Sequence, residues 1–140
     1  MQRIKTILFY FLSFTWGGIA SVTGGIVMLI LIIKGYKPKR FHNRIYIEVG
    51  QNWGGLELGC FFITDTTPTL HTKQHEAGHT IQNIIFGVFF PILVWIPSAI
   101  RYQYRRLTPN KKHPDYDAIW FEGQATRLGK KYFKEDTNNG

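Results

Sequence analysis

The hydrophobic positions of this chain form one long run near the N-terminus, followed by shorter and more patterned stretches. The run from Ile7 to Ile33 holds no charged residue, and it exceeds the roughly 20 residues that a helix needs to cross the hydrocarbon core of a bilayer. It therefore predicts a transmembrane helix. Basic residues flank the run and are more numerous after it, which predicts a single-pass protein whose C-terminal domain lies in the cytoplasm. They are Arg3 and Lys5 before the run, and Lys34, Lys37, Lys39, Arg40 and Arg44 after it.

A cleaved secretory signal is the alternative interpretation of this run, because Arg3 and Lys5 form a short basic n-region. The run is about twice as long as a usual h-region, and its small residues near Ala20 and Ser21 lie inside it. An uncleaved anchor over residues 1–35 is therefore the favoured prediction. The glycines of GGIASVTGG allow close packing against another helix, so a homodimer is an expected assembly.

The next segment alternates apolar and polar positions. RIYIEV and LELGCFFIT are rich in β-formers and are separated by the turn-like GQNWGG, which predicts a β-hairpin over residues 44–64. Thr72 is a plausible N-cap for a helix from Lys73 to Phe86 that ends near Gly87.

A second apolar stretch, residues 88–100, is interrupted by Pro91 and Pro97 and has basic residues on both flanks. A full crossing would place one basic cluster on the wrong side of a membrane, so a half-buried, re-entrant or surface-lying segment is favoured. A final helix is predicted from Tyr116 to Phe133 by its helical spacing of apolar residues. Residues 135–140 form a polar tail.

The formal charge of +8 and the pI near 9.7 first suggest a nucleic-acid partner. The basic residues, however, gather beside the two apolar stretches, at residues 34–44 and 101–113. Basic clusters in such places attract anionic lipid head groups. A lipid bilayer is therefore the expected partner, and nucleic acid is not.

Candidate chemistry is concentrated in the stretch HEAGHTIQN, which begins at His75. Residues four apart share one face of a helix, so His75 and His79 can direct imidazole nitrogens at one point, with Glu76 beside them. This is the HExxH spacing, in which two histidines bind zinc and the glutamate activates a water molecule. The alternative is a helix whose histidines are only hydrogen-bonded. Gln82 shares the face of His79, and it is either a partner of the site or an ordinary polar surface residue.

A catalytic zinc site needs a third protein ligand, and Glu122 is the best candidate. It lies in DAIWFEGQATRLG among apolar residues, where a carboxylate without a partner would be costly. An ion pair with Arg127 or Arg101 is the alternative explanation for its position.

HEAGH followed by EGQAT resembles the gluzincin metallopeptidases, and EGQATRLG is similar to the ExxxDRxG segment of membrane-bound peptidases related to the CAAX prenyl proteases. HEAGHTIQN with WFEGQAT also looks like small bacterial HExxH proteins of unassigned function. The resemblance implies that His75, His79 and Glu122 bind Zn²⁺ and that Glu76 is the general base. Together with the elements above it implies an α+β fold, in which the transmembrane helix precedes a minimal zincin-like domain over residues 36–134.

One position departs from the family pattern, because Thr126 stands where the family has an aspartate that accepts a hydrogen bond from a zinc-binding histidine. Either another acceptor, such as Asp65 or Asp117, replaces it or the site is weaker. The implied function is a membrane-anchored zinc metallopeptidase that hydrolyses peptide or protein substrates near the membrane surface. The alternative is an inactive zinc-binding membrane adaptor that keeps a peptidase-like fold.

Overall fold

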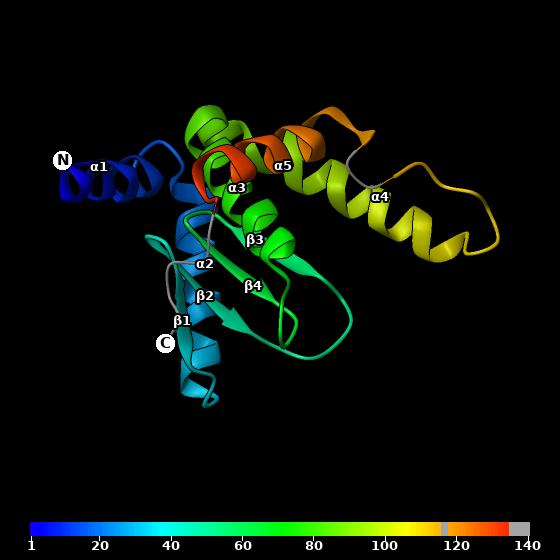
Figure 1. Cartoon of the computed structure of the whole chain (residues 1–140), viewed down its shortest axis with the longest axis horizontal. Coiled ribbons are helices and arrows are strands. Elements are labelled where there is room, and N and C mark those ends of the chain that lie inside the picture. The colour runs from blue at the N-terminus through cyan, green and yellow to red at the C-terminus, as the bar shows by residue number, and fades with distance from the viewer. Residues whose placement is uncertain (116–117, 135–140) are drawn as a thin grey trace.

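The computed structural model describes residues 1–115 and 118–134, and it shows an α+β arrangement of helices around a small mixed sheet (Figure 1). The predicted tail, residues 135–140, and the first residues of the predicted last helix, 116–117, lie outside the described part of the chain. The elements, in chain order, are α1 (Gln2–Phe14), α2 (Gly18–Ile33), β1 (Pro38–Phe41), β2 (Arg44–Glu48), β3 (Gly55–Leu58), β4 (Phe61–Thr64), α3 (Leu70–Phe86), η1 (Gly87–Phe89), η2 (Pro91–Trp95), α4 (Ile96–Leu107) and α5 (Trp120–Tyr132).

The prediction of a single transmembrane helix over residues 7–33, and with it the single-pass cytoplasmic topology, is wrong. The run is divided into α1 and α2, which meet at an angle of 98°. Among the described residues, no single helix is long and apolar enough to cross a membrane. Two pairs of consecutive helices, each bent at a short break, reach the length and apolar composition of a membrane span only if both members are counted together. They are α1 with α2, and residues 70–89 with residues 91–107.

The break between α1 and α2 lies against a buried amide side chain. Asn83 of α3 is fully buried, and its Nδ2 lies 3.5 Å from the carbonyl oxygen of Gly17 and 3.4 Å from Oγ of Ser21. A Cβ atom at Gly17 would lie 2.4 Å from that amide nitrogen. The turn at Gly17 thus leaves room for the Asn83 side chain and gives its amide nitrogen two acceptors, while Oδ1 has no hydrogen-bond partner.

The predicted single hairpin over residues 44–64 is also wrong, because its two halves pair in parallel. The sheet order is β1-β2-β4-β3, in which β1 and β2 form one antiparallel pair and β3 and β4 form another. β2 runs parallel to β4, with Ile45 opposite Phe61. The basic residues 38–41 pair with β2 as its hairpin partner, and β3 lies at the edge of the sheet.

Helices cover both faces of this sheet. Phe62 packs with Phe41, Tyr46 and Ala77 in a buried cluster between the sheet and α3. Its neighbour Phe61 points to the other face, where its ring contacts the Phe14 ring and lies against Gly25 of α2. Consecutive strand residues face opposite sides, so α3 and the α1–α2 pair enclose the sheet between them (Figure 1).

The helix that carries HEAGH begins earlier than predicted. Thr69, and not Thr72, is its N-cap, and its hydroxyl accepts a hydrogen bond of 3.1 Å from the backbone N–H of Thr72. Its end at Gly87, where φ is 57°, is as predicted. Beyond it, the apolar stretch forms the short turns η1 and η2 and then α4, and η2 is a π-helical turn.

Glycines let α3 and α5 pack at very short range. A Cβ atom at Gly78 would lie 1.9 Å from the carbonyl oxygen of Ala125, and one at Gly129 would lie 1.9 Å from that of Gln74. The two helix backbones are therefore in direct contact, and this contact brings the two predicted motifs together.

Candidate metal centre

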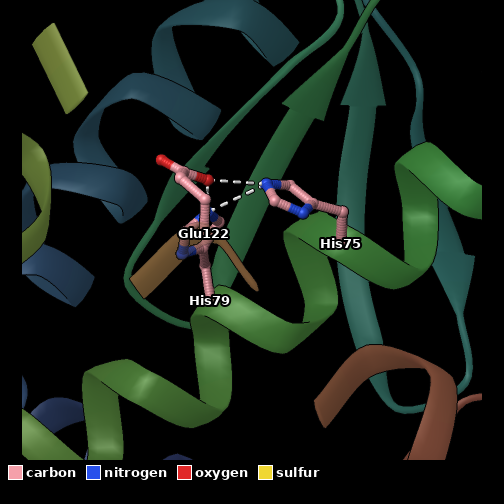
Figure 2. A group of neighbouring side chains, drawn as sticks. All are labelled: His75, His79 and Glu122. Carbon is pink, nitrogen blue, oxygen red and sulfur yellow. Dashed lines mark hydrogen bonds and ion pairs between the residues drawn. The ribbon is translucent and has the colours of Figure 1, made fainter. Parts of the chain in front are cut away.

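Three buried side chains converge between α3 and α5 (Figure 2). His75 and His79 come from adjacent turns of α3, and Glu122 comes from the first turn of α5. Their exposed fractions are 8%, 6% and 1%. Nε2 of His75 lies 2.9 Å from Oε2 of Glu122, Nε2 of His79 lies 3.1 Å from the same oxygen, and the two Nε2 atoms are 3.1 Å apart.

This arrangement fits a metal ion. Two imidazole nitrogens and one carboxylate oxygen form a donor set typical of zinc, whose bonds to nitrogen and oxygen are about 2.0–2.2 Å long. Tetrahedral ligands at that bond length lie about 3.3 Å from one another, so the three atoms need to separate by only a few tenths of an ångström. The buried His75, His79 and Glu122 group could therefore hold a metal ion.

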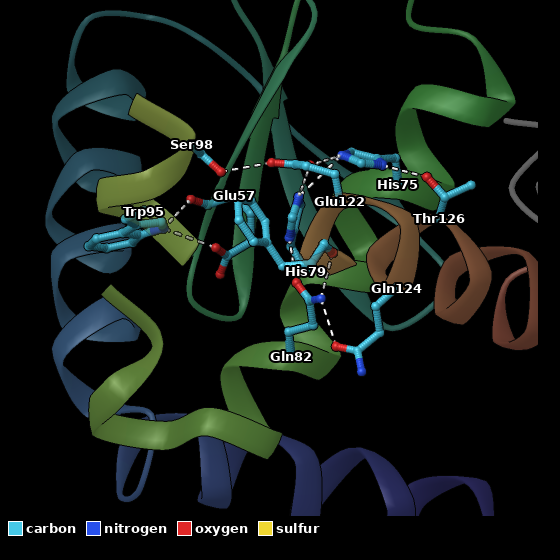
Figure 3. Close-up of polar contacts among 10 residues, drawn as sticks. Glu57, His75, His79, Gln82, Trp95, Ser98, Glu122, Gln124 and Thr126 are labelled. Carbon is cyan, nitrogen blue, oxygen red and sulfur yellow. Dashed lines mark hydrogen bonds and ion pairs between the residues drawn. The ribbon is translucent and has the colours of Figure 1, made fainter. Parts of the chain in front are cut away.

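The tautomer of His79 is set by Gln82 (Figure 3). The Gln82 amide nitrogen donates to the carbonyl oxygen of Phe121 at 2.7 Å and to Oε1 of Gln124 at 2.9 Å. Its Oε1 therefore faces Nδ1 of His79, at 2.7 Å. Because an amide oxygen only accepts hydrogen bonds, Nδ1 of His79 carries the proton. In the neutral ring Nε2 then carries no proton, as a metal ligand requires. This nitrogen points toward Glu122.

Thr126 orients the other histidine. Its Oγ1 lies 2.8 Å from Nδ1 of His75, in the position expected of an acceptor that directs the Nε2 of that ring toward the metal. Asp65, one of the alternative acceptors considered above, instead accepts a hydrogen bond of 3.1 Å from the backbone of Gly54. Asp117 lies outside the described residues.

Glu122 is ionised in this environment. Burial opposes its charge, but the polar contacts with His75, His79 and Ser98 outweigh that effect and hold its pKa well below the usual range. Ser98, on α4, donates to Oε1 of Glu122 at 2.7 Å. Arg101 donates to the backbone of Asp115 at 2.8 Å. The described contacts of the Glu122 carboxylate are thus with His75, His79 and Ser98.

Glu76 lies beside the triad and next to the edge strand β3. A Cβ atom at Gly55 would come within 2.7 Å of the Glu76 carboxylate, so this glycine leaves room for it. Glu76 is 6% exposed. Burial raises its pKa to about 7, the charge of His75 lowers it, and the charge of Glu122 raises it. A carboxyl group with this pKa can take up and release a proton near neutral pH.

Two polar contacts of this region were not predicted from the sequence. Ser98 is one, and Glu57 of β3 is the other. Glu57 is 3% exposed. Nε1 of Trp95 donates to Oε2 of Glu57 at 3.1 Å and to the carbonyl oxygen of Glu57 at 3.2 Å. The other carboxylate oxygen of Glu57, Oε1, has no hydrogen-bond partner. Burial raises its pKa well above the usual value. The available signal was a single polar residue in an apolar stretch: serine in VWIPSAI and glutamate in GLELG.

A zincin-like site also needs a hydrogen-bond donor for the oxyanion, and the sequence offers Tyr102, Tyr104, His113 and Tyr116 as candidates. Tyr102 and Tyr104 are about half exposed on α4, and His113 is hydrogen-bonded to Thr108 at 2.9 Å. Tyr116 lies outside the described residues. None of these side chains is assigned as an oxyanion donor.

Comparison with known proteins adds no relative to this geometry. No family model matches the sequence, and no curated protein or solved structure matches the chain.

Proposed function

We propose that this chain is a zinc-dependent metallopeptidase in which His75, His79 and Glu122 hold the metal and Glu76 is the general base. The observation that carries the proposal is the convergence of the three ligand atoms at 2.9–3.1 Å, together with acceptors on the far nitrogens of both histidines. When bound, zinc would supply a Lewis acid that polarises a carbonyl and acidifies a water molecule.

The chain's own residues would move the proton and place the substrate. Glu76, whose pKa is near 7, would take a proton from the attacking water and return it to the leaving amine. Gln82 and Thr126 would keep the ligand rings in place during this transfer.

The edge of β3 is a suitable place for an extended peptide. The carbonyl oxygen of Gly54 accepts a hydrogen bond of 2.8 Å from the backbone N–H of Asp65, the residue that follows β4. Backbone groups alternate along a strand, so those of Gly55 and Glu57 face away from β4. The Trp95 indole already occupies the carbonyl of Glu57. An added substrate strand would therefore pair at Gly55, directly beside Glu76.

A metal-binding but non-catalytic protein is the second candidate, and the burial of the site favours it. All three ligands and Glu76 are less than 9% exposed, which suits a metal that only joins α3 to α5. A catalytic site must in addition admit a substrate.

The decisive test is Glu76→Gln beside His79→Ala, with metal content measured by elemental analysis and hydrolysis measured on a library of fluorogenic peptides. A peptidase requires about one zinc per chain, retained in Glu76→Gln and lost in His79→Ala, with hydrolysis lost in both. Zinc retention without hydrolysis in the wild type would support the non-catalytic candidate. Absence of metal from the folded wild type would exclude both.

The pH profile gives an independent readout of Glu76. As a base it must be ionised, so kcat/KM should rise with pH along an acid limb. Burial places the pKa of Glu76 at about 7 in the metal-free chain, and the positive charge of a bound metal lowers it. The midpoint of the limb should therefore lie at or below pH 7. An acid limb well above that pH would point to another base.

A further inference from the structure

The two bent helix pairs meet at their corners. The Trp16 ring, in the turn between α1 and α2, packs edge-on against the ring of Phe89, with centroids 6.3 Å apart. Gly87, at the start of the second bend, lies against the same indole, so closely that a Cβ atom there would fall 1.9 Å from it. The bends of 98° and 115° thus form one joint corner of the molecule.

Apolar side chains point outward from this corner and along both arms of the first bend. Trp16, Phe89 and Ile92 are 43%, 56% and 62% exposed. On α2, exposed Val22, Ile26 and Leu29 follow one another at helical spacing, which places them on a single outward stripe. Exposed apolar side chains gathered along one helix face and at one corner are rare on monomers that contact only water, and such a surface usually marks an interaction site.

The segments that form this surface carry charged residues of one sign. Residues 1–47 and 77–114 contain no aspartate or glutamate, whereas both segments carry several lysines and arginines. Arg3 and Lys5 lie at the end of α1 away from the corner, and Lys34 directly follows α2. An apolar surface with basic residues at its periphery complements an anionic lipid surface, in which acyl chains lie beneath negative head groups.

We propose that the outward apolar faces of α1, α2 and residues 85–96, here called the corner surface, bind a membrane surface that contains anionic lipid. The lengths of the arms favour embedding in one leaflet over crossing. α2 has 16 residues and is about 24 Å long, which is shorter than the roughly 30 Å hydrocarbon core. This inference does not depend on the metal centre, which lies between α3 and α5.

The test is co-flotation of the purified full-length chain with vesicles of phosphatidylcholine alone or of phosphatidylcholine mixed with phosphatidylserine. The chain should float with both, more strongly with the anionic vesicles, and salt should reduce that difference. Ile26→Ser and Ile92→Ser should each lower vesicle partitioning roughly tenfold. Tyr132→Ser is the matched control: Tyr132 is 57% exposed but lies on α5, so it should leave partitioning unchanged.

Wild-type protein that stays unbound with both kinds of vesicle would overturn the proposal, as would an equal loss in the Tyr132 control. Sedimentation velocity tests the alternative that a second copy of this chain binds the corner surface. If the wild type self-associates, Ile92→Ser does not, and neither binds vesicles, the surface would be assigned to a second copy of this chain. Metal content measured on the same samples separates this inference from the proposed function, because Ile26→Ser and Ile92→Ser should bind as much zinc as the wild type.

Discussion

At the scale of single residues, the chemistry of the site depends on the acceptors behind the histidines. From the sequence, Gln82 was a candidate partner of the site and Thr126 stood at the position of an acceptor. The structure places each within 2.8 Å of one histidine Nδ1. Gln82 has a fixed orientation, because its amide nitrogen is bound to Phe121 and Gln124. The hydroxyl of Thr126 can rotate, so it is the weaker of the two acceptors.

Replacement of Thr126 tests this role. Thr126→Val keeps the shape of the side chain but removes the acceptor from His75, so zinc affinity should fall by about 10- to 100-fold. Thr126→Asp should restore or exceed wild-type affinity, since a carboxylate is a stronger acceptor. Competition with a chromophoric chelator measures both. Equal affinities in the valine variant and the wild type would show that Thr126 does not orient His75.

At the scale of elements, the centre exists because α3 and α5 touch. Gly78 lies inside the HEAGH motif, and its contact with the backbone of Ala125 sets how closely Glu122 approaches the histidines. Its role is therefore one of packing, although it stands between the two histidines of the candidate centre in the sequence.

Gly78→Ala should separate the two helices. The new Cβ would meet the backbone oxygen of Ala125 at 1.9 Å, and backbone cannot move aside as a flexible side chain does. We expect a loss of about 1–3 kcal/mol in the free energy of unfolding and weaker zinc binding. Gly18→Ala is the control, because nothing lies within 4 Å of a Cβ there. Urea denaturation measures both variants, and equal stability of the two would contradict the packing argument.

Elements governed by local pattern were predictable, and those governed by distant partners were not. The HEAGH helix and its end at Gly87 follow from helical spacing and a glycine stop. The break at Gly17 does not, because the side chain that packs against it, Asn83, lies far along the chain. The parallel pairing of β2 with β4 was missed for a similar reason. RIYIEV and LELGCFFIT indicate strands, but their alternation does not show whether a strand pairs with the next strand in the sequence or with a later one.

At the scale of the whole molecule, the centre links the N-terminal and C-terminal parts of the fold. α3 packs on the sheet through Ala77 and Phe62, whereas α5 closes over α3 from the end of the chain. Ser98 connects α4 to the same centre through Glu122. A metal ion held by both α3 and α5 would therefore stabilise the native arrangement as a whole and not only its immediate ligands.

Removal of the metal should consequently lower global stability. A ligand that binds only the native state stabilises it by RT ln(1 + [L]/Kd), about 4 kcal/mol when free zinc is a thousand times Kd. Thermal unfolding followed by circular dichroism should show a lower Tm after chelation and recovery when zinc is added back. Because a site that lacks one charged ligand binds zinc poorly, Glu122→Gln should unfold at one Tm with and without the chelator. A wild-type Tm that chelation leaves unchanged, despite confirmed loss of zinc, would mean that the ion does not join α3 to α5.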